Sequence, residues 1–167
     1  MMSVFIGRFH PVFVHLPIGI LLFAALLFFT AKKQKFAAVS AAVAPALAVG
    51  SFFSILSCIT GYLLSISDAY NESIVFKHQW LGIATAITSI VCYIAYQKKF
   101  KYAGALIVVL TALIIITGHN GGNLTHGEDY LTASLSNTKS DKKVIANINE
   151  AVVYKDVIEP ILAAKCY

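Results

Sequence analysis

Four long apolar runs, joined by short polar connections, fill most of this chain before residue 118. They cover residues 11–31, 36–66, 78–97 and 102–117. An α-helix of about 20 predominantly apolar residues crosses the hydrocarbon core of a bilayer. Short connections place consecutive helices beside each other and antiparallel. The sequence therefore predicts an all-α membrane protein, a bundle of four transmembrane helices that run alternately up and down.

The composition excludes an ordinary soluble domain. Hydrophobic residues make up 58% of the 167 residues and charged residues only 13%, whereas soluble proteins average about 45–50% apolar and about 25% charged residues. The net charge of +5 comes from lysines clustered at the ends of the apolar runs. Because the sequence has no basic groove with interleaved aromatic residues, we expect a lipid bilayer as the partner and no nucleic acid.

The positions of the lysines predict the orientation of the bundle. Basic residues are enriched in the cytoplasmic connections of membrane proteins. Two connections carry lysine clusters, after the first run (Lys32, Lys33, Lys35) and after the third (Lys98, Lys99, Lys101). The opposite ends carry only Arg8 and Lys77. We therefore expect a multi-pass protein of the bacterial inner membrane, with both termini in the periplasm.

All five histidines fall at or near the predicted periplasmic ends of the helices: His10, His15, His78, His119 and His126. Ionisable residues within membrane segments are costly and mark functional sites. A neutral imidazole binds haem iron, zinc and copper. The sequence therefore predicts a shared cofactor or metal site that faces the periplasm.

Helical geometry ranks these histidines. His10 and His15 are five positions apart, about 140° around a helix, so both cannot face one point unless Pro11 ends the helix between them. The glycines from Gly118 onward are expected to break the last helix and to leave His126 on an irregular segment. His15, His78 and His119 are therefore the preferred ligands, for a haem or for a metal ion, ahead of His10 and His126.

The identity of the cofactor stays open at this point. Gly19 and Gly82 lie one turn deeper than His15 and His78, where they leave room for the edge of a haem macrocycle. A tight cluster that adds a carboxylate from Asp68, Glu128 or Asp129 favours zinc or copper instead.

The choice of the ligand pair is also open. A short internal repeat relates residues 15–19 to residues 78–82 and places His15 and His78 in equivalent positions. The expected glycine-broken end of the last helix favours His119 instead.

The chain changes from mainly apolar to mainly polar after the last apolar run. The expected organisation is a four-helix transmembrane domain over residues 1–130, a polar periplasmic linker over 131–150 and the start of a further domain over 151–167. The last segment has the pattern of an opening amphipathic helix.

Two resemblances extend these expectations. The motifs 10–19, 78–82 and 117–127 resemble those of an uncharacterised bacterial family of four-helix membrane domains, whose histidine pattern is similar to that of diverse b-type cytochrome bundles. Residues 153–167 are similar to the opening of planctomycete-type c-type cytochrome domains, in which Cys166 matches the first cysteine of a Cys-x-x-Cys-His haem attachment site. This second resemblance implies a haem c attached through Cys166 if the chain continues.

We therefore expect a membrane module of a respiratory-type electron-transfer protein. A histidine-ligated haem b would exchange electrons with the quinone pool and with a tethered periplasmic c-type cytochrome domain. One alternative is a non-redox anchor or assembly subunit of a larger respiratory or other membrane complex, whose histidines form interhelical hydrogen bonds. Another is a zinc or copper site facing the periplasm. A stand-alone enzyme is less expected, because no acid–histidine–nucleophile spacing stands out.

Overall fold

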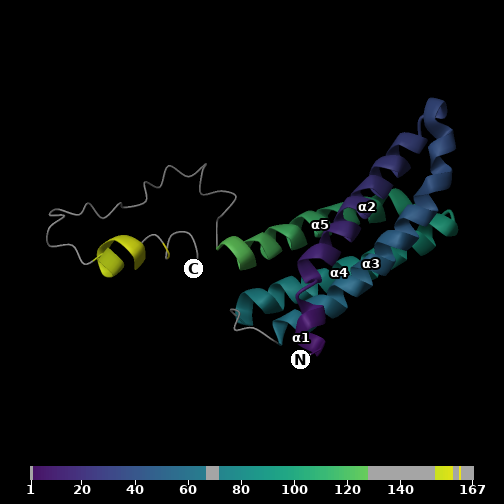
Figure 1. Cartoon of the computed structure of the whole chain (residues 1–167). Helices are drawn as coiled ribbons and strands as arrows, with labels where there is room; N and C mark the ends of the chain where they lie inside the picture. Colours follow the sequence, from purple (N-terminus) through teal and green to yellow (C-terminus); the bar gives the residue numbers. More distant parts are fainter. Residues whose placement is uncertain (1, 67–71, 128–152, 160–161, 163–167) are drawn as a thin grey trace. The chain divides into compact units, whose positions relative to one another are not determined.

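Helices account for almost all of the part of the chain that the structure, a computed structural model, describes: residues 2–66, 72–127, 153–159 and 162. The elements are α1 (Met2–Gly7), α2 (His10–Ala31), the 3-10 helix η1 (Gln34–Ala42), α3 (Val43–Ser65), α4 (Glu72–Gln97), α5 (Ala103–His126) and the π-helical turn η3 (Val153–Ile158) (Figure 1). Four segments are long and apolar enough to cross a membrane: Val4–Ala31, Gln34–Ser65, Ser73–Gln97 and Ala103–His126. The prediction of an all-α, multi-pass membrane protein is confirmed to this extent.

The chain divides into two units, Met1–Asn120 and Gly121–Tyr167. The first holds the four long helices up to the last turns of α5. In the second, the structure describes the end of α5 and the turn η3. The predicted linker over residues 131–150, Cys166 and most of the segment 151–167 lie outside the described residues.

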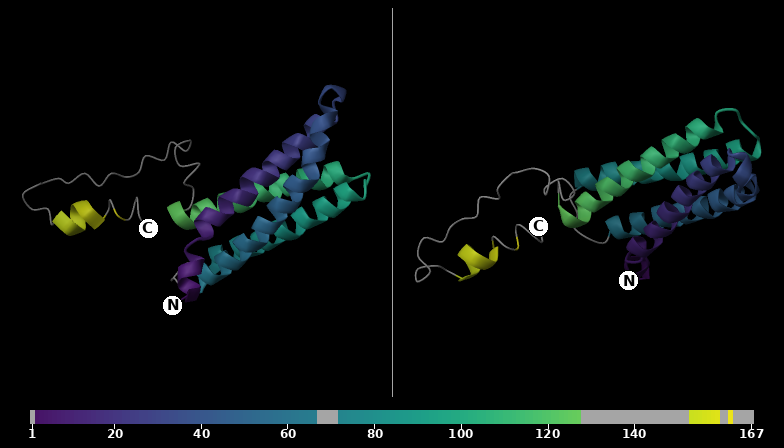
Figure 2. Two further views of the ribbon diagram at one scale, coloured as in Figure 1. Left: turned by 45° about the vertical axis from the view of Figure 1, so that its right-hand side comes forward. Right: turned by 90° about the horizontal axis from the view of Figure 1, so that it is seen from above.

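The four long helices alternate in direction, as the short connections predict (Figure 2). The first residue of α2, His10, contacts α3 near its C-terminal end, at Ser57. His78, in the first turns of α4, likewise contacts Thr117 in the C-terminal half of α5. We call this the histidine end of the bundle. The opposite end, where α2 and α4 finish, is the lysine end.

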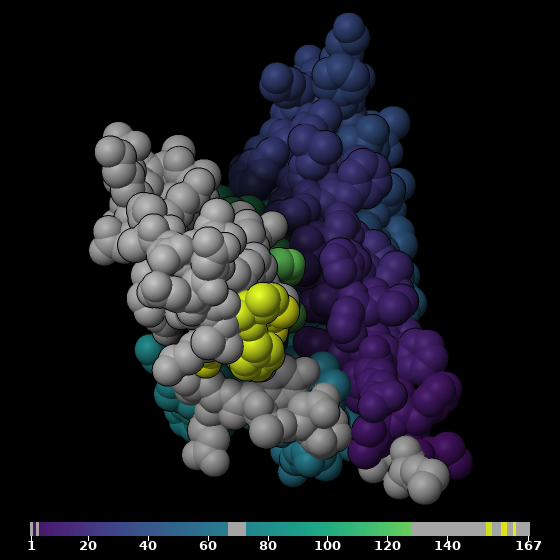
Figure 3. All heavy atoms as spheres, turned by 60° about the vertical axis from the view of Figure 1, so that its left-hand side comes forward, coloured from purple at the N-terminus to yellow at the C-terminus, as the bar shows by residue number. Residues whose placement is uncertain are grey.

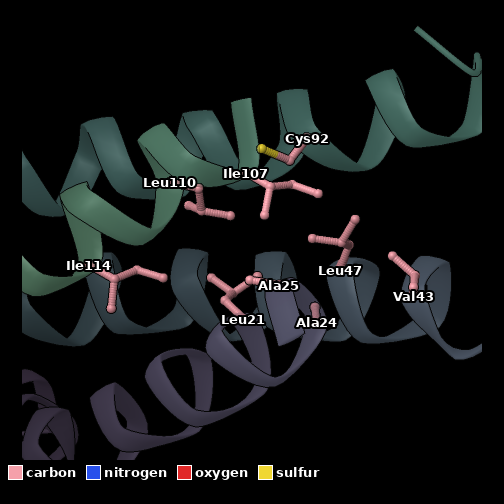
Figure 4. Close-up of a cluster of buried hydrophobic side chains, with 9 residues drawn as sticks. All are labelled: Leu21, Ala24, Ala25, Val43, Leu47, Cys92, Ile107, Leu110 and Ile114. Carbon is pink, nitrogen blue, oxygen red and sulfur yellow. The ribbon is translucent and has the colours of Figure 1, made fainter. Parts of the chain in front are cut away.

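The core of the bundle combines aliphatic and small side chains, and many other large apolar side chains face outward. The core cluster takes residues from all four helices: Leu21, Ala24, Ala25, Val43, Leu47, Cys92, Ile107, Leu110 and Ile114 (Figure 4). Large apolar residues such as Phe23, Val108 and Ile115 are more than half exposed, as side chains in contact with lipid must be. Small residues at helix interfaces are typical of membrane bundles, in which van der Waals packing drives association. The space-filling view shows α2 in purple packed against α3 in blue (Figure 3).

The helix break predicted at the glycines is wrong, because α5 continues to His126. Glycine lowers helix stability by only about 1 kcal/mol relative to alanine. Polar side chains also form hydrogen bonds to the helix backbone here. The Asn120 amide donates to the carbonyl of Ile116 over 2.9 Å, and the Thr125 hydroxyl donates to the carbonyl of Gly122 over 3.1 Å. The helix ends instead at Gly127, which has a φ of 90° and donates its N–H to Asn123.

The other helix boundary at issue is the start of α2. Pro11 occupies the first turn of this helix and does not end one, as expected for a residue whose missing N–H has no intrahelical partner there. His10 and His15 therefore lie on one continuous helix and face different directions.

The contact between α1 and α3 leaves no room for a side chain at Gly7. A Cβ there would lie 2.7 Å from the backbone N of Leu64 and 2.9 Å from the carbonyl carbon of Leu63. We expect Gly7→Ala to lower the free energy of unfolding of the detergent-solubilised protein by about 1–3 kcal/mol, because backbone atoms would have to move. Thermal unfolding followed by circular dichroism measures this effect.

Gly19→Ala is the matched control, because a Cβ at Gly19 would meet nothing within 4 Å. There we expect a neutral effect or a stabilisation of up to about 1 kcal/mol, since alanine favours the helix. Equal losses of stability at both glycines would contradict the packing of α1 on α3.

Candidate functional site

The imidazoles of His10 and His78 are neighbours at the histidine end. Their ring centroids are 6.3 Å apart and the ring planes are inclined at 78°. His10 comes from the first residue of α2 and His78 from the second turn of α4. Both side chains are half-buried. The site therefore joins two helices that are not consecutive in the bundle.

Helix α3 fixes the position of the His10 ring. The Nδ1 atom of His10 lies 3.0 Å from the carbonyl oxygen of Ser57 and 3.4 Å from the hydroxyl oxygen of Thr60. Gly61 lies against the same ring, since a Cβ at this position would be 2.9 Å from Cε1 of His10. Residues three and four positions apart share one helix face, so Ser57, Thr60 and Gly61 together form the surface that receives the imidazole.

Helix α5 fixes the position of the His78 ring in the same manner. Its Nδ1 atom lies 3.2 Å from the carbonyl oxygen of Thr117. The Thr117 hydroxyl is in turn 3.1 Å from the hydroxyl of Thr85, which lies two turns along α4 from His78. Each histidine is thus bonded to a backbone carbonyl of a neighbouring helix.

These hydrogen bonds determine the tautomer of both rings. A carbonyl oxygen only accepts hydrogen bonds, so Nδ1 is the donor, and the Nε2 atom of a neutral ring keeps its lone pair. Histidines that bind metals have this arrangement, in which the other ring N–H donates to a carbonyl or carboxylate. Nε2 is therefore the nitrogen through which either ring could bind a metal.

The separation of the rings fits one metal centre between them. Two imidazoles that bind one metal through nitrogen at about 2 Å can have ring centres about 6 Å apart, and the His10 and His78 centroids are 6.3 Å apart. If a haem is bound here, these are the two residues that would hold its iron, and the iron would supply one-electron chemistry.

The contacts that the structure gives for the other predicted ligands are local ones. His15 is exposed, and its Nδ1 contacts the carbonyl of Pro11 in its own helix. His119 is exposed on α5. His126 is the last residue of α5, and its Nδ1 lies 2.7 Å from the Thr125 hydroxyl. His78 thus meets His10, and not His15 as the internal repeat favours.

The glycines predicted to make room for a macrocycle border open space. A Cβ at Gly19 or at Gly82 would meet nothing within 4 Å. Gly82 lies one turn from His78 on the same side of α4, and Thr85 on that side contacts Thr117 of α5 one turn further on. Gly19 lies one turn from His15 in α2.

A tight metal-ion cluster finds no counterpart in the part of the chain that the structure describes. No group of three or more His, Cys, Asp or Glu there could hold a metal ion. The hard ligands proposed for such a cluster, Asp68, Glu128 and Asp129, lie outside the described residues, and their role stays a prediction.

The contact of His10 with α3 has a signal in the sequence. Ser57, Thr60 and Gly61 mark a face of small and polar residues in the second apolar run. Such a face near a helix end can receive an imidazole from a neighbouring helix. Pro11 is common in the first turn of a helix, and it places His10 at the helix start.

Comparison with known proteins assigns no relative. No family model matches the sequence, and neither a curated protein nor a solved structure matches it. The resemblances to four-helix membrane domains and to c-type cytochromes therefore stay predictions, and the function is inferred from the geometry of the histidine end.

Proposed function

We propose that this protein is the membrane module of an electron-transfer system, in which His10 and His78 hold a haem b at the histidine end. The observation that carries the proposal is the paired arrangement of the two rings. Their centroids are 6.3 Å apart, and each Nδ1 is bonded to a backbone carbonyl. Haem iron supplies one-electron chemistry when it is bound. The carbonyls of Ser57 and Thr117 would keep the protons on Nδ1 and leave the Nε2 lone pairs for the iron.

Two imidazoles meet in the part of the chain that the structure describes, and this number favours haem over a metal ion. A structural zinc ion takes four protein ligands, and a catalytic one takes three. The haem macrocycle supplies four nitrogen atoms itself, so two imidazoles complete its coordination. The open space beside Gly82, one turn from His78, also supports a large, flat cofactor.

The proposed orientation places this site near the periplasmic surface of a bacterial inner membrane. It rests on the six lysines of the opposite connections, at positions 32, 33, 35, 98, 99 and 101. The haem would then exchange electrons with the quinone pool and with the periplasmic c-type cytochrome that the segment 151–167 resembles.

A second candidate function is a non-redox anchor or assembly subunit of a larger membrane complex. The observation in its favour is that both histidine contacts are interhelical hydrogen bonds, from α2 to α3 and from α4 to α5. Such bonds stabilise membrane bundles by about 0.6 kcal/mol on average. In this interpretation the imidazoles have a structural role and carry no cofactor.

A reduced-minus-oxidised optical spectrum of the full chain separates these functions. The protein is expressed in haem-supplied cells, purified in detergent and divided for metal analysis. We expect a b-type spectrum and a haem that acidified acetone extracts, since haem b is not covalently attached. Bound zinc or copper without this spectrum would overturn the haem assignment. A folded protein with neither haem nor metal would leave the anchor as the function.

A further inference from the structure

A basic hollow lies at the lysine end, far from the histidines. Its volume is about 650 Å³, and it lies between the C-terminal end of α2 and the connection from α4 to α5. Three lysines line it: Lys32, Lys99 and Lys101. Aromatic side chains surround them: Phe28, Phe29, Tyr96, Phe100 and Tyr102.

Two of the three ammonium groups form cation–π contacts with aromatic rings. The Nζ atom of Lys32 is 5.0 Å from the centroid of the Phe28 ring, and the Nζ atom of Lys101 is 4.7 Å from that of Tyr102. Cation–π contacts of this kind restrict a lysine without neutralising its charge. Gly104 gives Lys32 further room, because a Cβ at this position would lie 3.3 Å from its Nζ. The lysine side chain therefore reaches the start of α5.

The bundle offers these lysines no counter-charge. The sequence has no Asp or Glu between residues 1 and 67 or between residues 73 and 127. Every segment that lines the hollow falls within these two ranges. No carboxylate within these two ranges balances the lysines, so the hollow suits an anionic ligand.

We infer that the hollow binds the phosphate head group of an anionic phospholipid. Basic pockets between transmembrane helices at the cytoplasmic side of a membrane suit such head groups. The hollow is also lined by Phe29, Ala105 and Val108, and Val108 is 56% exposed on the side of α5 that faces outward. Lipid acyl chains would continue from the head group along this apolar surface, whereas a free anion would leave it uncovered. This inference does not depend on the histidine site.

Native mass spectrometry of the full chain, titrated with phosphatidylglycerol in a neutral detergent, tests this inference. We expect the triple variant Lys32→Gln, Lys99→Gln, Lys101→Gln to weaken lipid binding by about 10- to 100-fold, since each basic residue near an anionic head group adds to the attraction. The matched control, Lys33→Gln, Lys35→Gln, Lys98→Gln, removes the same charge from the same end. Its lysines do not line the hollow, so it should bind like the unmodified chain.

Two outcomes would overturn the inference. Equal losses in both triple variants would show a general attraction between charges without a defined site. Displacement of the lipid by millimolar inorganic phosphate would show a site for free anions. Each variant keeps three of the six lysines at this end. The charge that orients the protein in the membrane is therefore reduced equally in both.

Discussion

We expect His10→Ala and His78→Ala each to abolish the b-type spectrum of the purified protein. Each substitution removes one of the two imidazoles whose centroids lie 6.3 Å apart. Loss of a partner that only orients a ligand weakens metal binding by about 10- to 100-fold, so loss of the ligand itself should weaken haem binding by at least about 100-fold. Haem content per chain, measured from the pyridine haemochrome, gives this result directly.

The matched controls are His15→Ala and His119→Ala. Both residues are exposed histidines of the same bundle, and the sequence ranks both above His10. We expect these variants to keep their haem. A spectrum that survives His10→Ala and disappears in His15→Ala would instead support the pairing that the internal repeat favours.

A ligand role can be distinguished from a structural role by chemical rescue. His78→Gly leaves a space that free imidazole can enter. If His78 is a ligand, added imidazole should restore the low-spin spectrum. If His78 only contributes its hydrogen bond to Thr117 over 3.2 Å, imidazole should change no spectrum, and the variant should lose stability alone.

The second large effect is expected at Gly61, which packs against the His10 ring. A Cβ here would lie 2.9 Å from Cε1 of His10 and 3.1 Å from its Nδ1. The ring cannot move away without losing its hydrogen bond to Ser57. We expect Gly61→Ala to weaken haem retention by about 10- to 100-fold, as the loss of an orienting partner does. The rate of haem transfer to excess apomyoglobin measures the change.

Gly19→Ala is the control for Gly61→Ala, because it adds the same methyl group to an open helix surface. It should leave the rate of haem transfer unchanged. An unchanged rate in Gly61→Ala as well would show that the His10 ring is not held by α3 in the loaded protein, and would argue against His10 as a ligand.

The number and the alternation of the helices follow from hydropathy alone. About 20 apolar residues form one span, and short connections reverse the chain. The same patterns do not set the helix ends. Helix α5 passes through Gly118, Gly121 and Gly122, because the cost of glycine in a helix is small when the preceding turns are already held in the bundle. Composition alone does not show whether packing of the preceding turns outweighs the cost of these glycines.

The sequence predicts at which end of the bundle the candidate site lies. It does not predict how each helix is turned about its own axis. That His10, His15 and His78 belong to one end follows from the alternation of the helices. Which of them meet depends on how each helix is turned about its axis. A rotation of about 140° separates His10 from His15, and the packing of His10 against Gly61 of α3 selects between them. This selection needs the three-dimensional structure.

The pair of His10 and His78 connects all four long helices. His10 links α2 to α3 and His78 links α4 to α5, while the centroids of the two rings lie 6.3 Å apart. A ligand held by both rings would therefore cross-link two antiparallel hairpins. A ligand that binds only the folded state adds its binding free energy to the stability of that state. The melting temperature of the entire bundle then measures the fraction of the protein in which the His10–His78 pair holds a ligand.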